Sequence, residues 1–300
     1  MLLLRINKLK DGMMEYRKLG QSNLEVSLIG YGGWALSGKG WGDINKKEAL
    51  ETVEKSIENG INFFDTAPVY GFGKSEELLG MLLSSVRKKV IIATKCGLRW
   101  DDRGRVFHDL TRDAVLRDIE SSLARLKTDY IDLYQIHWPD KKTELNETLD
   151  TLNELKKDGV IRFIGLSNFN TELLGKATDL AEITSLQALY NMLQRDAERD
   201  LLPFCKKNGV GFICYSPLAQ GILSGKINED FKPGRHDVRR FNPLFRSRDK
   251  FRECIAFTKK LSSPPGLKAL KFLADNKEVS SILVSMTKVN HLMENLKIYE

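Results

Sequence analysis

The feature that most constrains the fold is a series of short apolar segments, which alternate with segments whose apolar residues recur at helical spacing. Eight strand candidates follow one another along the chain, and they begin at Val26, Ile61, Val90, Ile131, Ile161, Ser185, Val210 and Ser281. Most intervals are close to the roughly 30 residues of a strand–helix–strand unit, and no Pro-, Gly- or Ser-rich linker divides the chain. The pattern predicts an α/β fold in which a parallel sheet closes into a (β/α)8 TIM barrel, with an open doubly wound sheet as the alternative.

The sequence between these strands also indicates where helices begin and end. Asn45 followed by Glu48 forms a capping-box pattern at the start of the first helix, and Gly60 ends that helix. Thr111 is expected to open a later helix, and the leucines of 145–155 form a single apolar face on the next one. Helices with one apolar face are what the outer layer of such a barrel requires.

Two regions fall outside the repeated units. Residues 15–26 predict a short hairpin that caps the barrel floor, and residues 1–13 are expected to be an N-terminal extension of one domain over residues 14–300. The interval between the seventh and eighth strands is about twice as long as the others and holds a basic stretch, 232–252. This long loop is expected either to meet an anionic ligand or to be a solvated loop.

Composition excludes several other classes of protein. The chain has 300 residues, of which 42% are hydrophobic and 29% charged, with a net charge of +7, as in soluble globular proteins. No apolar stretch approaches the roughly 20 residues of a membrane helix, and the first twelve residues do not form a signal peptide, so a cytoplasmic location is expected. The four cysteines lack the spacing of metal ligands, which argues against structural zinc. The basic residues are not accompanied by the aromatic residues or repeats that are typical of nucleic-acid binding.

A glycine-rich segment after the first strand formally satisfies a dinucleotide fingerprint. Residues 30–35 read GYGGWA, but Gly38, Gly40 and Gly42 follow, so that no helix can start before about Asn45. The fingerprint works only where a helix begins within the glycines and presents its amides to a pyrophosphate. We therefore reject this interpretation and expect a tight turn at the barrel mouth, with Trp34 as an apolar wall of the pocket.

Four polar residues fall at the ends of neighbouring strands, where they would face one mouth. They are Asp65, Tyr70, Lys95 and His137. Together they supply a proton donor, a cation expected to lower its pKa, a carboxylate that holds the cation, and an imidazole that orients a substrate oxygen. This set suits protonation of a carbonyl oxygen while a hydride from a cofactor reaches the carbon.

Five segments carry a resemblance to a known family. They are GINFFDTAPVYGFGKSEELLG from Gly60, ATKCG from Ala93, DYIDLYQIHWPD from Asp129, GVIRFIGLSNF from Gly159 and YSPLAQGILSGK from Tyr215. In order and spacing they resemble the aldo-keto reductase superfamily. The resemblance implies a (β/α)8 barrel that binds NADPH, or less often NADH, and reduces aldehydes or ketones. It also implies that Tyr70 is the acid, that Lys95 and Asp65 tune it, and that His137 orients the carbonyl.

The resemblance further implies the cofactor contacts. Ser167, Asn168 and Gln187 match the partners of the carboxamide, and Tyr215 matches the aromatic ring beneath the nicotinamide. The remaining implied contacts are Gly33, Trp34 and Asp65 at the strand ends, Ser216, Pro217, Leu218, Gly221 and Lys226 over the pyrophosphate, and Ser285, Thr287, Lys288, His291, Glu294 and Asn295 toward the adenosine.

Cofactor preference and substrate are less closely specified. Where relatives often have glycine and, two residues later, lysine or arginine, this chain has Ser285 and Thr287, and Lys288 is displaced by one, so we expect NADPH with NADH possible. The expected substrate pocket, for a small carbonyl compound, consists of Trp34, Tyr70, Trp100, His137 and Trp138. The alternative function is a cofactor-binding regulatory subunit on the same barrel, as in potassium-channel β subunits.

Overall fold

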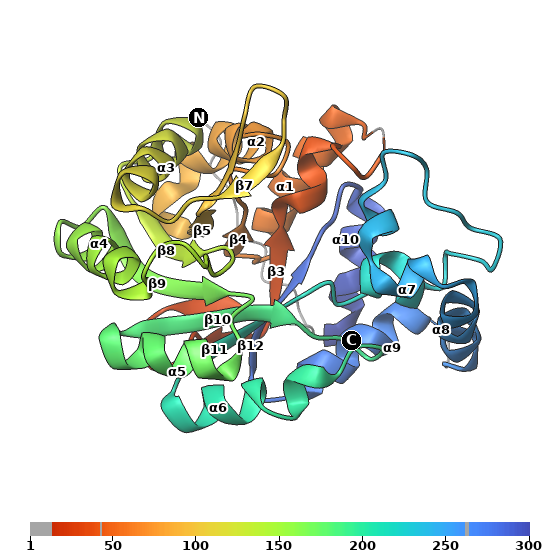
Figure 1. Cartoon of the computed structure of the whole chain (residues 1–300). Helices are drawn as coiled ribbons and strands as arrows, with labels where there is room; N and C mark the ends of the chain where they lie inside the picture. The colour runs from red at the N-terminus through yellow and green to blue at the C-terminus, as the bar shows by residue number, and fades with distance from the viewer. Residues whose placement is uncertain (1–13, 43, 262–263) are drawn as a thin grey trace.

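A closed barrel of eight parallel strands lies at the centre of the molecule (Figure 1). The computed structural model describes residues 14–42, 44–261 and 264–300, so the extension predicted for residues 1–13 lies outside the described residues. In order around the barrel the strands are β3 (Ile29–Gly32), β4 (Phe63–Asp65), β5 (Ile91–Cys96), β8 (Ile131–Ile136), β9 (Ile161–Ser167), β10 (Ile183–Leu189), β11 (Gly211–Tyr215) and β12 (Val279–Val284). The predicted (β/α)8 architecture is confirmed, and the open sheet is excluded.

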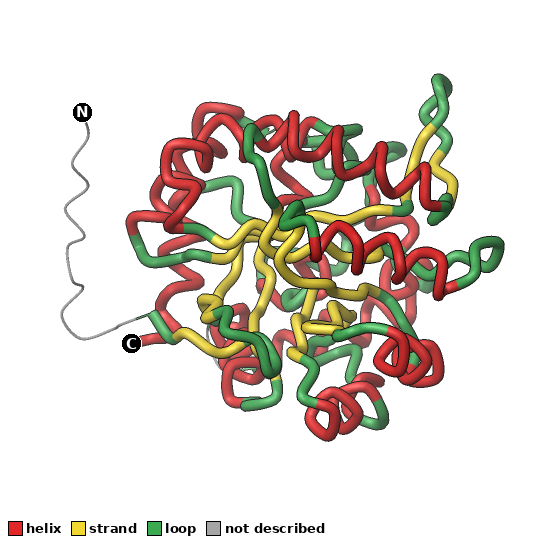
Figure 2. The backbone as a smooth tube through the Cα atoms, turned by 90° about the vertical axis from the view of Figure 1, so that its left-hand side faces the viewer, coloured by secondary structure: helices red, strands yellow, loops and turns green. Residues whose placement is uncertain are grey.

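Helices surround this barrel on its outer side (Figure 2). They include α1 (Lys46–Glu58), α2 (Lys74–Leu83), α3 (Arg112–Leu126), α4 (Leu145–Lys157), α5 (Thr171–Leu180), α6 (Leu201–Asn208), α9 (Pro265–Asp275) and α10 (Val289–Leu296). Asn45 caps α1 as predicted, because its Oδ1 accepts the Glu48 amide at 3.2 Å. Thr111 precedes α3, but its hydroxyl donates to Asp109 instead of capping that helix. Within the described ranges, no helix has both the length and the apolar character to cross a membrane.

The predicted N-terminal hairpin closes the barrel floor. Strand β1 (Tyr16–Lys18) pairs antiparallel with β2 (Glu25–Ser27). The side chains of Leu19, Leu24 and Val26 are buried against inward-facing residues of the barrel strands. The strand candidate that we placed from Val26 is therefore divided, because Val26 and Ser27 belong to the hairpin and the barrel strand begins at Ile29.

The long interval between β11 and β12 is helical for much of its length, contrary to the loop that we predicted. It contains the 3-10 segments η4 (Ala219–Ser224) and η5 (Val238–Phe241) and the helices α7 (Pro243–Arg246), α8 (Arg248–Lys260) and α9. Residues of α8 such as Phe251 and Ile255 form a small core of their own with Ile222. The basic stretch also approaches the segment after β3, since the Val238 amide donates to the Gly40 carbonyl at 2.9 Å.

A second hairpin, which the sequence did not predict, follows β5 at the barrel mouth. Its strands are β6 (Leu98–Trp100) and β7 (Val106–His108). The amide of Gly97, at the root of the hairpin, donates to the Asp118 carboxylate of α3 at 3.0 Å. The hairpin thus extends the rim directly after the strand that carries Lys95.

Candidate active site

The four polar residues predicted from the strand ends meet at the carboxyl end of the barrel. Asp65 ends β4, Tyr70 lies in the turn that follows, Lys95 lies in β5, and His137 directly follows β8. The Lys95 ammonium donates to Asp65 Oδ1 at 2.6 Å and to the Tyr70 hydroxyl at 3.4 Å. The His137 ring stands edge-on to the Tyr70 ring, with centroids 5.7 Å apart. One small site therefore holds a phenol, an ammonium, a carboxylate and an imidazole.

Two glutamine amides complete the surroundings of Asp65. The Nε2 atoms of Gln135 and Gln187 donate to Asp65 Oδ2 at 3.0 and 2.8 Å, so both carboxylate oxygens are bonded. Sequence reasoning missed Gln135. Its position two residues before His137 in a strand was the available signal, since residues i and i+2 of a strand face the same side.

The protonation states differ from our expectation in one respect. We expected the Lys95 ammonium to make the Tyr70 phenol acidic, but burial raises the pKa of Tyr70 well above its ordinary value, and the charge of Asp65 acts in the same direction. The ammonium lies closer to Asp65 and to the Thr66 carbonyl, at 2.6 and 2.9 Å, than to the phenol. Tyr70 is therefore a neutral phenol that retains its proton, which is the form that a general acid requires.

His137 is neutral for a related reason. Burial holds the pKa of His137 well below its usual range, and the nearby charges of Lys95 and His108 lower it further. A neutral imidazole has one N–H donor and one acceptor nitrogen, so it is able to donate a hydrogen bond to a carbonyl oxygen without adding a charge.

Aromatic side chains form one wall of the site. The Trp34 ring stacks on Tyr70 with centroids 6.0 Å apart, and Trp41, which sequence reasoning missed, meets Trp34 edge-on at 5.0 Å. The predicted pocket residue Trp100 instead stacks on Phe72 at 5.1 Å, in the rim hairpin. Trp138 is 42% exposed beside His137.

Two of the three residues expected to hold a carboxamide, Ser167 and Asn168, form a connected set with Tyr215 beside this wall. The Tyr215 hydroxyl donates to Asn168 Oδ1 at 2.7 Å, and Asn168 Nδ2 donates to the His137 carbonyl and to Ser167 Oγ, both at 3.0 Å. Gln187 lies apart from this set, because its amide is bonded to Asp65 and Gln135. The ring of Tyr215 is thereby held next to the catalytic candidates.

Strained backbone is concentrated around the same mouth. Among the described residues, six non-glycine residues have positive φ, and five of them are Phe72, Asn168, Ser216, Ala219 and Gln220. The sixth, Lys127, ends α3. Such conformations persist where the surroundings enforce them, and they cluster at ligand sites. The segment 216–221, which we predicted over a pyrophosphate, is held in part by Asn191, whose amide donates to the Ser216 carbonyl at 3.0 Å.

Comparison with known proteins identifies the family. The sequence model of the Aldo/keto reductase family matches residues 28–300. The chain belongs to the aldo/keto reductase family. Over 250 residues, or 83% of this chain and 75% of the relative, it is 38% identical to the aldo-keto reductase YhdN of Bacillus subtilis. Over 231 residues, or 72% of this chain and 71% of the relative, it is 38% identical to the NADH-specific methylglyoxal reductase of Escherichia coli.

A solved structure agrees with this assignment. The glycerol dehydrogenase of Gluconobacter oxydans superposes with a TM-score of 0.85 at 31% identity, and the match covers 95% of this chain and 90% of that one. This aldo/keto reductase is accordingly an NAD(P)-dependent oxidoreductase.

In this aldo/keto reductase, one residue expected over the pyrophosphate binds one expected toward the adenosine. The Lys226 ammonium lies 2.7 Å from a Glu294 carboxylate oxygen and joins the segment after β11 to α10. Both side chains are about half exposed, at 54% and 53%, so the pair is screened by water and adds little stability. Lys288 and Ser285 are exposed, and His291 is half-buried on α10.

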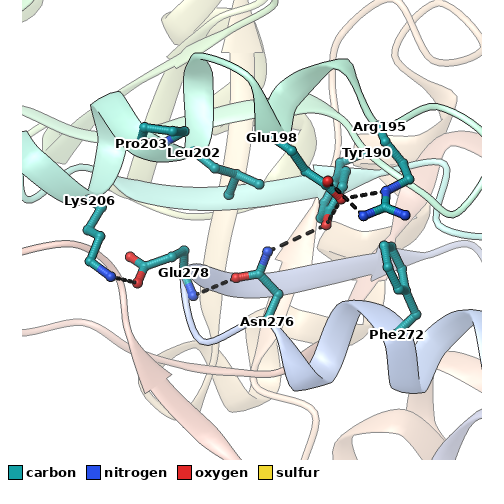
Figure 3. A pocket seen from close by; sticks show the side chains of 9 residues that line it. All are labelled: Tyr190, Arg195, Glu198, Leu202, Pro203, Lys206, Phe272, Asn276 and Glu278. Carbon is teal, nitrogen blue, oxygen red and sulfur yellow. Dashed lines mark hydrogen bonds and ion pairs between the residues drawn. The ribbon is translucent and has the colours of Figure 1, made fainter.

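A separate groove of about 510 Å³ lies on the outer wall, between α6 and α9 (Figure 3). Its charged side chains neutralise one another, because Arg195 pairs with Glu198 at 2.7 Å and Lys206 pairs with Glu278 at 2.8 Å. The Tyr190 hydroxyl also donates to Glu198 at 2.7 Å. This network holds α6 against the start of β12 and has no group aimed at a ligand.

Asp118 is expected to make the stability of this aldo/keto reductase depend on pH. Burial raises its pKa from 3.8 to about 6. Because the pKa of Asp118 is higher in the folded state than in the unfolded chain, protonation of this carboxyl group stabilises the folded state. This stabilisation is complete below pH 3.8 and is lost as pH rises through about 6. Asp118→Asn keeps an acceptor oxygen for the Gly97 amide and abolishes the titration.

We therefore expect Asp118→Asn to be about 3 kcal/mol more stable than the wild type at pH 8 and nearly equal to it at pH 4. Urea unfolding at the two pH values measures the difference. A difference that does not change with pH would contradict the assigned titration.

Proposed function

We propose that the protein reduces an aldehyde or ketone to an alcohol with NADPH, that NADH is also accepted, and that Tyr70 is the general acid. The observation that carries the proposal is the contact of the Tyr70 hydroxyl with Lys95, which is itself fixed by Asp65, beside the neutral imidazole of His137. Protonation of a developing alkoxide requires a donor held in this way.

Each side chain has a separate role in this mechanism. His137 and Tyr70 bind the carbonyl oxygen from two sides and orient it, and Tyr70 then donates its proton to that oxygen. A bound dihydronicotinamide supplies the hydride to the carbonyl carbon. The Lys95 ammonium stabilises the phenolate that remains on Tyr70, and Asp65, bonded by Gln135 and Gln187, holds the ammonium in place.

The cofactor contacts follow from the connected set beside the aromatic wall. We propose that Asn168 and Ser167 bind the carboxamide and that Tyr215, held by Asn168, stacks on the nicotinamide ring. Lys288 supports NADPH, because it is exposed at the start of α10 and makes no ion pair with any described residue. Both cofactors need testing, since the Escherichia coli relative is named an NADH-specific enzyme.

The substrate is proposed to be a small carbonyl compound bound between Trp34 and His137. The names of two relatives point to methylglyoxal and to glycerol, whose oxidation yields glyceraldehyde or dihydroxyacetone. Small oxygenated aldehydes are therefore the first compounds to screen, followed by aromatic aldehydes that suit the tryptophan wall.

The test combines binding with turnover. NADPH and NADH are titrated against the intrinsic fluorescence of the protein, and oxidation of each reduced cofactor is followed with the aldehyde panel. Cofactor binding with aldehyde-dependent oxidation is expected. Binding with no oxidation above background would favour the regulatory subunit instead.

A further inference from the structure

We propose that Phe72 is a positioning residue, whose ring, held between Trp100 and Lys39, fixes the turn that aims the Tyr70 hydroxyl at Lys95. This inference rests on the proposed function of Tyr70 as the acid. Phe72 belongs to none of the predicted contacts, and it is not among the hydrogen-bond partners of the Lys95 ammonium.

The backbone after Tyr70 is unusual. Gly71, Phe72 and Gly73 all have positive φ, at +65°, +56° and +89°. Glycine adopts this region freely, but a phenylalanine there is strained by contact of its Cβ with the backbone. An interaction of the Phe72 side chain must therefore offset the strain.

The structure shows that interaction. The Phe72 ring stacks on Trp100 of the β6–β7 hairpin, with centroids 5.1 Å apart and planes 25° apart. The ammonium of Lys39, from the segment after β3, lies 3.1 Å from the centroid of the Phe72 ring. Gly104, at the hairpin tip, also lies close to this ring. Two other segments of the rim thus meet on the Phe72 side chain.

The turn that contains Phe72 is tied down at both ends. The Gly73 amide donates to the Pro68 carbonyl at 2.6 Å, and the Ser75 amide donates to the Tyr70 carbonyl at 3.2 Å. The Ser75 hydroxyl in turn donates to the Gly33 carbonyl at 2.8 Å. Between these ties the Phe72 amide donates to the Val69 carbonyl at 3.4 Å, and the Lys74 amide donates to the Gly71 carbonyl at 3.3 Å. The Phe72 stack adds the side-chain contact that holds this bonded turn against the rim hairpin.

The contact between Tyr70 and Lys95 depends on this turn and tolerates little displacement. At 3.4 Å, the distance between the Tyr70 hydroxyl and Lys95 is the longest of the three ammonium contacts. A displacement of the phenol by about 1 Å breaks the contact, and misplacement on this scale reduces rates by about a hundredfold. The aromatic stack at Phe72 therefore acts on catalysis through Tyr70.

Substitution of Phe72 distinguishes the contribution of its ring from that of its backbone conformation. Phe72→Gly removes the ring but relieves the strain, so a purely structural role in the backbone predicts an unchanged or more stable enzyme. Our proposal predicts that kcat and kcat/KM fall together by about tenfold or more, that the cofactor affinity is unchanged, and that Phe72→Tyr, which keeps the stack, retains the wild-type kcat.

A matched control and a double-mutant cycle complete the experiment. Lys127→Gly relieves the same left-handed strain at the end of α3 and is expected to leave kcat unchanged. Trp100→Leu should lower kcat, and combining it with Phe72→Gly should add little, because both substitutions break one stack. Hydrogen exchange should accelerate in residues 98–108 of Phe72→Gly, which reports the stack independently of turnover.

The outcomes distinguish this inference from the proposed function. A wild-type kcat in Phe72→Gly, a Phe72→Tyr variant as slow as Phe72→Gly, or additive effects of Phe72→Gly and Trp100→Leu would each overturn the positioning role, while the function of Tyr70 would stand. A wild-type enzyme that reduces no carbonyl, or a Tyr70→Phe variant of full activity, would overturn the proposed function and this inference with it.

Discussion

Tyr70→Phe is expected to reduce kcat for carbonyl reduction by roughly 10²–10⁴-fold, because it removes the only proposed proton donor to the alkoxide. The ring itself remains, and with it the stack on Trp34 at 6.0 Å and the edge contact with His137 at 5.7 Å. The substitution should therefore leave the fold and the cofactor affinity almost unchanged. Steady-state kinetics with NADPH and an aldehyde measure the loss, and fluorescence titration measures the binding.

The control for this prediction is a second Tyr→Phe substitution at the opposite end of the barrel. The hydroxyl of Tyr16 in the floor hairpin donates to the Gly60 carbonyl at 2.7 Å and lies far along the chain from the mouth. Tyr16→Phe is expected to keep the wild-type kcat. If Tyr70→Phe were as active as Tyr16→Phe, another group would have to supply the proton.

Asp65→Ala is expected to have the largest effect on folding, a loss of about 3–5 kcal/mol in the free energy of unfolding. Lys95 is completely buried, and Asp65 is its carboxylate partner at 2.6 Å. Without Asp65 the ammonium loses its bonded carboxylate, and the charge of Glu76 alone still favours the protonated form, so the already lowered pKa of Lys95 falls further. Lys95 then binds its proton more tightly in the unfolded chain than in the folded protein. The loss of stability should therefore shrink as pH rises toward 10.5, the ordinary pKa of lysine.

The double variant Asp65→Ala with Lys95→Met tests the electrostatic cause. It removes both charges and is expected to be more stable than Asp65→Ala alone, although carbonyl reduction stays lost in both. Urea unfolding followed by circular dichroism measures the three proteins at pH 7 and 9. Equal instability of the single and double variants would show that lost packing, and not the unpaired ammonium, causes the effect.

The barrel could be predicted because its information is local in the sequence. Each of the eight strands is a short apolar run, such as the fully buried IDLYQI of β8, between amphipathic helices. Once the sheet is parallel, Asp65, Lys95 and His137 must share one rim, because each lies at the carboxyl end of its strand. The floor hairpin followed from the same reasoning.

The parts that were missed depend on contacts between distant segments. The β6–β7 hairpin has only six strand residues, and the stack of Phe72 on Trp100 joins two loops whose lengths carry no periodic signal. The helices of 243–260 pack on Ile222 and Leu223, a partner that no local pattern reveals. Chain segments without a regular pattern are placed by the neighbours that they meet after folding.

The eight-stranded barrel and the four polar residues at its mouth could be derived from the residues alone, because strand period and strand direction decide both. The direction in which the pKa of Tyr70 shifts became clear from the folded molecule. A pKa depends on burial and on distances of a few ångströms. Here burial, together with the charge of Asp65, raises the pKa of Tyr70, so the phenol stays protonated.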